Sequence, residues 1–332
     1  MKEAKILIIG FGSIGKRHFN NLLMLEYKNI SIVSRHSNEK DKYDNIIQRY
    51  NNIDDAFKDY NYDIAIISTE TSEHIKILEK ILKYNVKNIY LEKPISHEYK
   101  EYQDIITIIN RKKINIIVGY DLHFELGLLK VKELLEKNSI GNVISFIAEV
   151  GQYLPDWRPG VDYRNTMSSK VKDGGGVMLD LIHEVDYLNW LIGPFSKVAN
   201  INDQVSELEI DTEDVAVFIL KSKDGIIGSL HLDYLQKDLC RKCKFIGNSG
   251  TIIWDYVKRE VKWKTHSCTS WSNFDYSFQE RNDRFIDIMK AFLNSTKKIE
   301  DNRLCSFEEA LISLKIVHNS KESNLNNRII KL

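Results

Sequence analysis

The chain has 332 residues, of which 47 are basic, 47 are acidic and 43% are hydrophobic, so its formal net charge is zero. This composition is typical of a globular protein of about two domains and excludes disordered, collagen-like and coiled-coil chains. The balanced charge argues against a nucleic acid or an anionic membrane surface as partner, and no apolar run reaches the roughly 20 residues of a membrane span. We therefore expect a cytoplasmic protein whose partners are small molecules or other subunits.

Apolar strands alternate with amphipathic helical patterns over the first 120 residues. The strand-like runs are KILIIG, ISIV, DIAIIST, NIYLE and NIIVGY. Such alternation predicts a parallel sheet that is covered by helices on both faces. Residues 1–120 are therefore expected to form a doubly wound, Rossmann-type α/β domain.

A glycine motif follows the first predicted strand and begins a predicted helix. Gly10, Gly12 and Gly15 form a G-x-G-x-x-G pattern there. In a dinucleotide-binding turn the three glycines allow the tight turn, the approach of the pyrophosphate and the packing of helix on strand, and the helix N-terminus attracts the anion. Ser13 and Ile14, between the last two glycines, are also candidate cofactor-binding residues. The alternative is a glycine-rich turn that binds no ligand.

The end of the second strand predicts which dinucleotide binds. An Asp or Glu at this point holds the ribose of NAD, but the chain has Ser34, Arg35 and His36. A guanidinium suits a 2′-phosphate, so NADP is slightly favoured over NAD. A solvated Arg35 that tolerates either cofactor is almost as good an interpretation.

A charged triplet follows the strand NIYL. Glu92, Lys93 and Pro94 come at its carboxyl end, and open parallel sheets bind their ligands at that edge. These residues are therefore candidates for a ligand site.

The pattern changes after Tyr120. A helix is predicted over 124–137, a strand over 143–150 and an irregular stretch over 152–172, followed by repeated alternation and turns from 197 to 264 and by helices over 283–293 and 307–320. This order predicts a second α/β domain over residues 121–332, with a large and mainly antiparallel sheet. One face of that sheet has no obvious helix to cover it.

The irregular stretch is rich in aromatic and guanidinium groups. Trp157, Arg158, Tyr163 and Arg164 lie on it, and prolines stiffen it. Aromatic faces and guanidinium forks suit a sugar ring and an attached carboxylate or phosphate. We count these four residues as candidate substrate-binding residues, with an interface or simple loop packing as the alternative.

Three consecutive glycines, residues 174–176, precede a predicted helix that carries polar groups. Asp180, His183, Glu184 and Tyr187 share one face of a continuous helix, and the opposite side is apolar. This pattern fits the wall of an active site as well as it fits a core histidine paired with a carboxylate. The bare glycines leave room for a nicotinamide and a substrate, or they form a structural hinge.

No metal site is predicted. Cys240 and Cys243 form C-R-K-C, but no second Cys or His pair completes a zinc site.

Together these motifs resemble the Gfo/Idh/MocA family, the glucose–fructose oxidoreductase and inositol dehydrogenase family of NAD(P)-dependent enzymes. The resemblance covers nearly the whole chain, and it rests on GFGSIGKRH at 10–18, STETSEH at 68–74, LEKP at 91–94, GYDLHF at 119–124, DGGGVMLDLIHEVDYL at 173–188 and SFEEAL at 306–311.

The resemblance implies roles for residues of both predicted domains. Thr69 and His74 match positions that line the dinucleotide, and Glu92 matches one near the nicotinamide ribose. Lys93 matches the catalytic or substrate-binding lysine of the family. Tyr120 follows in the GYDLHF motif and is a candidate substrate-binding residue.

Asp180 and His183 resemble the paired acid and base of the family's substrate site. In family members the His usually comes four positions after this Asp, whereas in this chain it comes three positions after it. Glu184 occupies the fourth position and is the reserve candidate. Tyr187, on the same predicted face, completes the candidate substrate-binding residues.

The resemblance implies hydride transfer between NAD(P) and a hydroxyl or keto carbon of a polyol, sugar or nucleotide sugar, and the loop arginines favour a sugar or nucleotide sugar of glycan biosynthesis. His183 is expected to act as the base, with Asp180 orienting it and Lys93 hydrogen-bonding the reacting oxygen. The alternatives are an NAD-dependent glycosidase that oxidises its substrate transiently and a non-catalytic regulator that senses the dinucleotide. A homodimer or homotetramer is expected, as in the family.

Overall fold

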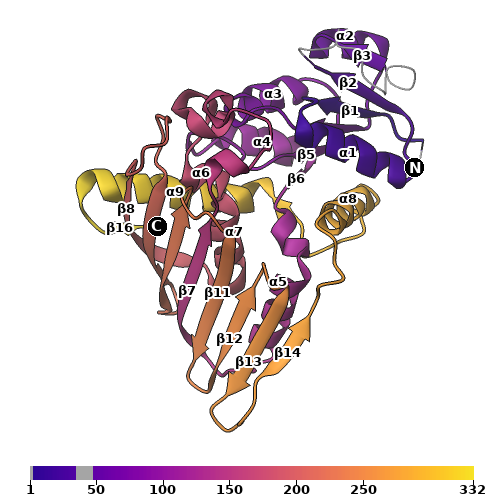
Figure 1. The fold of residues 1–332 in the computed structure, drawn as a ribbon. Helices are drawn as coiled ribbons and strands as arrows, with labels where there is room; N and C mark the ends of the chain where they lie inside the picture. The colour runs from indigo at the N-terminus through magenta and orange to yellow at the C-terminus, as the bar shows by residue number, and fades with distance from the viewer. Residues whose placement is uncertain (1–2, 35–47) are drawn as a thin grey trace. The chain divides into compact units, whose positions relative to one another are not determined.

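The computed structural model describes residues 3–34 and 48–332 (Figure 1). The chain forms two compact units, Met1–Asp121 with Asn282–Leu311, and Leu122–Arg281 with Ile312–Leu332. The change at Asp121 lies beside the predicted boundary at residue 120. Residues 282–311, which were expected in the second domain, instead belong to the first unit, because helix α8 (Asp283–Ser295) packs on helix α1 (Ser13–Met24).

The first unit contains a seven-stranded sheet in the order β15-β6-β5-β4-β1-β2-β3. Its pairs are parallel except for β15, which runs antiparallel to β6. The strands are β1 (Ile6–Ile9), β2 (Ile30–Val33), β3 (Gln48–Tyr50), β4 (Ile64–Ile67), β5 (Asn88–Leu91), β6 (Asn115–Val118) and β15 (Cys305–Ser306). This topology confirms the predicted Rossmann fold.

The central strands are buried on both faces. All four residues of β1, β2 and β4 are buried, as expected where helices cover a parallel sheet on both sides. Besides α1 and α8, the helices of this unit are α2 (Ile53–Asp59), α3 (His74–Ile81) and α4 (Gln103–Lys112). Strands β3 and β15 are not among the predicted elements, because strands of three and two residues give no recognisable apolar run.

The second unit contains a nine-stranded sheet in the order β14-β13-β12-β11-β7-β10-β9-β8-β16. Among the described strands, the parallel pair is β10 with β7 and the other neighbours are antiparallel, which confirms the predicted mainly antiparallel sheet. The strands are β7 (Val143–Gly151), β8 (Phe195–Asp203), β9 (Val215–Ser222), β10 (Ile227–Asp233), β11 (Cys240–Gly247), β12 (Gly250–Asp255), β13 (Glu260–Thr265), β14 (Ser272–Asp275) and β16 (Ile330–Lys331).

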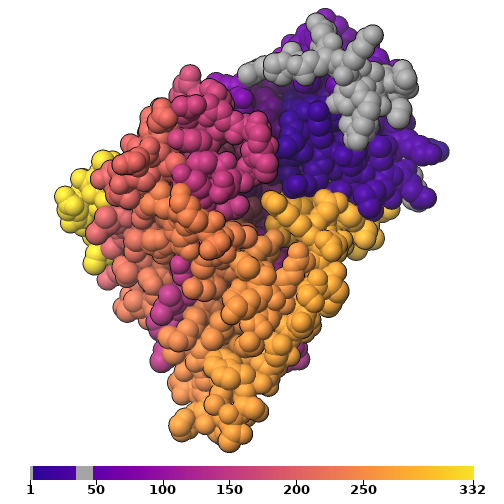
Figure 2. Space-filling model, viewed as in Figure 1, coloured from indigo at the N-terminus to yellow at the C-terminus, as the bar shows by residue number. Residues whose placement is uncertain are grey.

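One face of this sheet forms the core of the unit, and the other is open. The inner row includes Phe146, Phe218 and Trp254, which have no exposed side-chain surface. Helices α5 (Leu126–Glu136), α6 (Val177–Asp180), α7 (Ile182–Ile192) and α9 (Phe307–Asn326) complete the described elements. In Figure 1 helices α5 and α9 lie behind the strands, and Figure 2 shows the strand residues, in salmon to orange, at the surface.

No helix within residues 3–34 and 48–332 combines the length and the apolar character that a bilayer crossing needs.

Candidate functional site

The glycine turn after β1 shows why each motif position needs glycine. Gly10 has a φ of +92°, which disfavours other residues. A Cβ on Gly15 would lie 2.2 Å from the Gly10 carbonyl oxygen, whereas a Cβ on Gly12 would meet nothing within 4 Å. The chain itself therefore requires glycine at 10 and 15, and Gly12 leaves open space at the start of α1.

That open space lies at a helix N-terminus. Gly12 is the N-cap of α1 and provides no capping side chain, Ser13 is exposed and Ile14 is half-buried. The first backbone N–H groups of such a helix attract anions. The turn thus fits the pyrophosphate of a dinucleotide, which these residues would hold.

Other predicted cofactor residues also follow parallel strands. Ser34 follows β2, where its N–H donates to the Tyr50 carbonyl oxygen at 3.1 Å. Thr69 follows β4 and is half-buried. Since parallel strands end at one edge, these residues and Gly10 share the ligand-binding edge of the sheet. Arg35 and His36 lie outside the described residues, so the predicted contact with a 2′-phosphate stays a prediction.

Glu92 follows β5 at the same edge and is held by a buried histidine. The Glu92 Oε1 atom is 2.7 Å from His18 Nε2, and His18 has no exposed surface. The Lys93 backbone N–H donates to the other Glu92 carboxylate oxygen at 3.3 Å. His18 therefore positions the residue that directly precedes Lys93, and Lys93 itself is half-buried.

His74 holds the other side of Lys93. Its Nδ1 atom is 2.7 Å from the Pro94 carbonyl oxygen and its Nε2 atom is 3.1 Å from that of Thr69. The side chain is 1% exposed, and burial lowers the pKa of its imidazole below the usual 6.5. His74 thus links the loop after β4 to the peptide after Lys93. The contact with the dinucleotide that the resemblance implies for it stays a prediction.

Tyr120, which follows β6, is a buried residue. Its side chain is 1% exposed, as is typical of a tyrosine in a protein core. Its predicted contact with substrate stays a prediction that this burial does not favour.

The predicted catalytic helix of the second unit is in fact two helices. Helix α6 ends at Asp180, Leu181 leaves the helical conformation with φ −100° and ψ 24°, and α7 begins at Ile182. The sequence predicted that four polar residues share one open face of a continuous helix. This prediction is wrong for Glu184 and Tyr187, which are buried.

Asp180 and His183 remain at the surface of this segment. All the remaining residues from Gly174 to Leu188 are buried, whereas these two are half-buried. The hydroxyl of Tyr234 donates to Asp180 Oδ2 at 2.7 Å. Burial and the adjacent carboxylate raise the pKa of Tyr234 well above its usual value, so this hydroxyl stays protonated and fixes the Asp180 carboxylate.

Glu184 and Tyr187 point into the core instead. Glu184 is fully buried, and one of its oxygens is 3.0 Å from the guanidinium of Arg241 on β11. Tyr187 is fully buried with its ring at an edge-to-face distance of 5.5 Å from Trp254. A role for Glu184 as the base would therefore require breaking a buried ion pair, and the burial of Tyr187 does not favour its predicted contact with substrate.

The glycine triplet is filled by the chain itself. A Cβ on Gly175 would lie 2.3 Å from the Met167 carbonyl oxygen, and one on Gly176 would lie 2.5 Å from a carboxylate oxygen of Glu213. Gly174 and Gly176 also have positive φ values of 88° and 110°. These glycines are explained by close backbone packing, rather than by the empty space for nicotinamide and substrate that the sequence suggested.

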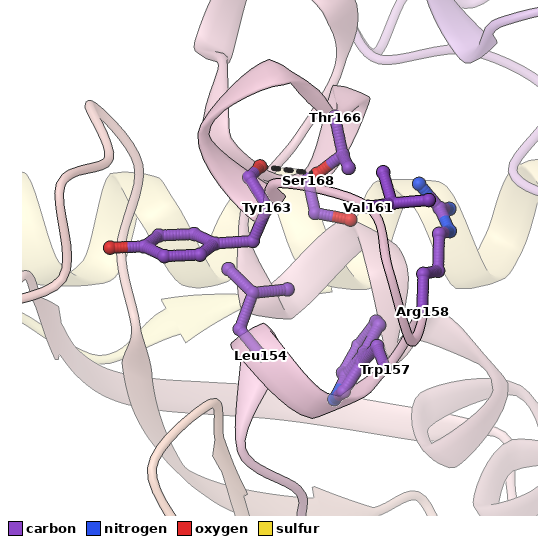
Figure 3. A pocket seen from close by; sticks show the side chains of 7 residues that line it. All are labelled: Leu154, Trp157, Arg158, Val161, Tyr163, Thr166 and Ser168. Carbon is purple, nitrogen blue, oxygen red and sulfur yellow. Dashed lines mark hydrogen bonds between the residues drawn. The ribbon is translucent and has the colours of Figure 1, made fainter.

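The predicted irregular stretch consists of short 3-10 turns. They cover Leu154–Asp156, Tyr163–Asn165, Met167–Ser169 and Val171–Asp173. Trp157, Arg158 and Tyr163 line one small hollow on this stretch (Figure 3). Arg164 lies elsewhere on the loop, where it pairs with Asp162 and Glu209. The structure therefore groups three of the four candidate residues.

In the described part of the chain, no set of three or more His, Cys, Asp or Glu side chains lies close enough together to hold a metal ion.

Comparisons with known proteins follow the same division of the chain. Residues 4–120 match the family described as an oxidoreductase family with an NAD-binding Rossmann fold, and residues 128–253 match the GFO/IDH/MocA C-terminal domain. The chain belongs to the GFO/IDH/MocA family. It is accordingly an NAD(P)-dependent oxidoreductase that acts on CH–OH groups.

Relatives and solved structures extend along nearly the whole chain. A myo-inositol 2-dehydrogenase from Thermotoga maritima is 24% identical, covering 99% of this chain and 98% of the relative. An inositol 2-dehydrogenase from Salmonella typhimurium is 22% identical over 83% of this chain and 84% of its own.

Among solved structures, the WlbA dehydrogenase from Bordetella pertussis, in complex with NADH and UDP-GlcNAcA, has a TM-score of 0.82. Its sequence is 17% identical, and the match covers 99% of both chains. An oxidoreductase from Agrobacterium radiobacter, in complex with NAD⁺, L-tartaric acid and magnesium, has a TM-score of 0.84 at 18% identity, covering 99% of this chain and 98% of that one. These likenesses establish the shared fold.

Three residues of the site were not predicted from the sequence. His18, Tyr234 and Arg241 contact Glu92, Asp180 and Glu184 across long sequence separations. The motif GFGSIGKRH includes His18, but nothing in one sequence marks which distant residue a side chain contacts.

The position of His74 predicts a pH-dependent stability. Glutamine cannot reproduce the ring that bridges the two carbonyl oxygens in this buried position, so about 1–2 kcal/mol of stability should be lost near pH 7.5. Because burial lowers the folded-state pKa of His74, the unfolded chain takes up a proton before the folded one does, and wild-type stability falls as pH drops below about 6.5. His74→Gln removes that contribution.

Urea denaturation near pH 7.5 and near pH 5.5 measures this difference. The stability gap between wild type and His74→Gln should narrow at the lower pH, while the exposed control Lys76→Ala should track wild type at both. A gap that widens as the pH falls would contradict the burial of a neutral His74.

Proposed function

We propose that the chain transfers a hydride between NAD(P) and a CH–OH carbon of a sugar, polyol or nucleotide sugar, in glycan biosynthesis. The observation that carries this proposal is the exposure of Asp180 and His183 alone along an otherwise buried segment, Gly174 to Leu188. Carboxylate and imidazole side chains on a buried segment are themselves buried only when they have a structural role there. Glu184 and Asp186 on this segment are buried, so Asp180 and His183 are the carboxylate and imidazole that keep exposed surface for contact with a substrate.

When bound, the nicotinamide supplies the hydride chemistry. The protein must then remove or return the hydroxyl proton of the substrate. An imidazole has an unperturbed pKa near 6.5 and can do so near neutral pH. We assign this step to His183, with Asp180, whose carboxylate Tyr234 holds in place, orienting the imidazole or a neighbouring hydroxyl.

Lys93 is assigned to the reacting oxygen. Its backbone is held on one side by Glu92 and on the other through the Pro94 carbonyl oxygen, which His74 contacts. The fixed backbone sets the point from which the Lys93 side chain extends, and orientation of reacting groups contributes strongly to rate.

The substrate class rests on relatives that carry polyol and sugar names. The inositol 2-dehydrogenases act on a polyol by name, and the WlbA structure holds a nucleotide sugar. The aromatic and cationic loop at 154–168 favours a sugar with an attached anionic group. The cytoplasmic location expected from the sequence stays a prediction.

Substitution of the assigned residues tests the mechanism. Lys93→Ala and His183→Ala should each reduce kcat by about 10²- to 10⁴-fold, because each removes a proton-transferring or oxygen-binding group, while the dissociation constant for NADP stays within about threefold. Steady-state turnover and fluorescence titration of the reduced cofactor measure the two quantities.

Matched controls are Lys76→Ala and His266→Ala, which remove one exposed residue of each type. Both should turn over at the wild-type rate. Near-normal turnover in Lys93→Ala or His183→Ala would refute the assigned role.

We also propose that NADP is preferred over NAD, through Arg35. Titration of the wild-type chain with both cofactors should give tighter binding of NADP, and Arg35→Asp should reverse the order, since a carboxylate binds the ribose hydroxyls and repels the phosphate. If the wild type and Arg35→Asp each bound NADP and NAD with equal affinity, Arg35 would have no role in the choice of cofactor.

We further propose a homodimer or homotetramer that covers the open face of the second sheet. On that face Ile147 and Ile219 both flank Ser229 in register and are 51% and 49% exposed. Exposed apolar rows of this kind mark interaction surfaces. Light scattering gives the mass of the purified chain in solution, and a monomer at micromolar concentration would contradict the proposal.

A further inference from the structure

The loop between β7 and α6 encloses one small hollow. Figure 3 shows the side chains around it, which are Leu154, Trp157, Arg158, Val161, Tyr163, Thr166 and Ser168. The enclosed part of the hollow is about the size of one water molecule, and the rest is open to solvent. It therefore has room for a group the size of one oxygen atom of a larger molecule, and not for a sugar ring.

The two arginines of the loop differ in whether acidic side chains neutralise their charge. The Arg164 guanidinium donates to both Asp162 oxygens and to Glu209 Oε1, at 2.9 to 3.1 Å. Two carboxylates thus surround one cation, and this cluster repels a further anion. Arg158 has no acidic partner among the described residues and lies on the hollow. The positive charge that a ligand can use is therefore that of Arg158.

The hollow has fixed polar and aromatic walls besides Arg158. The indole N–H of Trp157 donates to the Gln152 carbonyl oxygen at 3.0 Å, which sets the plane of the ring. Thr166 donates its hydroxyl to the Tyr163 carbonyl oxygen at 2.7 Å. Ser168 is 1% exposed, and Figure 3 shows its hydroxyl turned toward the space beside Arg158. A hydroxyl and a guanidinium together suit an oxyanion.

Direct contacts connect the hollow to the proposed acid–base pair. The ring of Trp157 meets that of Tyr234 edge to face at 5.2 Å, and Tyr234 donates to Asp180. The carbonyl oxygen of Ser168 accepts from the N–H of Gly176, directly before α6. The hollow and Asp180 thus belong to one packed assembly within the second unit. A group bound in the hollow can belong to the same molecule whose hydroxyl Asp180 and His183 contact.

We infer that this hollow binds an oxyanionic substituent of the substrate, a carboxylate or a phosphate, through Arg158 and Ser168 beside the face of Trp157. The inference rests on the proposed function and narrows its substrate class to acidic sugars. Arg164 holds the loop to Asp162 and Glu209 and does not contact the anion.

Binding to paired acidic and neutral sugars tests this inference. Calorimetry with the enzyme bound to reduced dinucleotide compares glucuronate with glucose, galacturonate with galactose, and the uronate of N-acetylglucosamine with its parent sugar. Glucose 6-phosphate separates phosphate from carboxylate recognition. In at least one pair the acid should bind about 10- to 100-fold more tightly than the neutral sugar, the value of a charge-assisted hydrogen bond.

Variants locate the preference. Arg158→Gln should remove it, Arg158→Lys should restore part of it, and the exposed control Arg328→Gln should keep it in full. The inference is overturned if no acid binds more tightly than its neutral partner, or if Arg158→Gln keeps the preference. Thermal denaturation shows that each variant is folded.

This binding readout does not depend on turnover. A preference for acids that Arg158→Gln abolishes supports the hollow even if no sugar reduces the dinucleotide, in which case the proposed oxidoreductase reaction on sugars fails separately. Turnover of neutral sugars without any preference for acids would overturn the inference and leave the proposed function standing.

Discussion

Helix α1 approaches the turn after β1 so closely at Gly15 that a Cβ there would lie 2.2 Å from the Gly10 carbonyl oxygen. This contact sets the helix N-terminus at the carboxyl edge of the sheet, where an anion is attracted. It also places His18, one turn further along α1, against Glu92. The glycine that serves the cofactor turn therefore also serves the peptide before Lys93. Dinucleotide binding and lysine positioning depend on the same contact between α1 and the turn after β1.

The second unit positions its polar groups by burying their neighbours. Glu184 is anchored to Arg241 on the sheet, and Tyr234 holds the carboxylate of Asp180. Because the segment around them is packed, Asp180 and His183 have few directions in which to point. Such pre-organisation is what general acid–base catalysis requires of its groups. The loop with Arg158 is joined to the same packing through Trp157 and Ser168.

The sequence allowed the fold class to be predicted because its signals are local. Apolar runs of four residues mark the buried parallel strands, and the spacing of Gly10, Gly12 and Gly15 marks the turn after β1. Strands β3 and β15 lack such a run. The sequence does not reveal the break at Leu181, because helical periodicity continues across it. This break turns Glu184 and Tyr187 into the core. Pairings such as His18 with Glu92 depend on tertiary packing, which no local pattern encodes.

Deuterium tracing tests hydride transfer most directly. The chain is incubated with oxidised dinucleotide and with sugars deuterated at the ring carbons, and mass spectrometry follows the nicotinamide. Hydride transfer predicts one deuterium in each reduced nicotinamide, and reduced cofactor that accumulates in proportion to the sugar oxidised. Cleavage of a glycosidic bond without accumulation of reduced cofactor would indicate transient oxidation instead. A dinucleotide that binds but never acquires deuterium from any sugar, including the acidic ones, would contradict the enzyme mechanism.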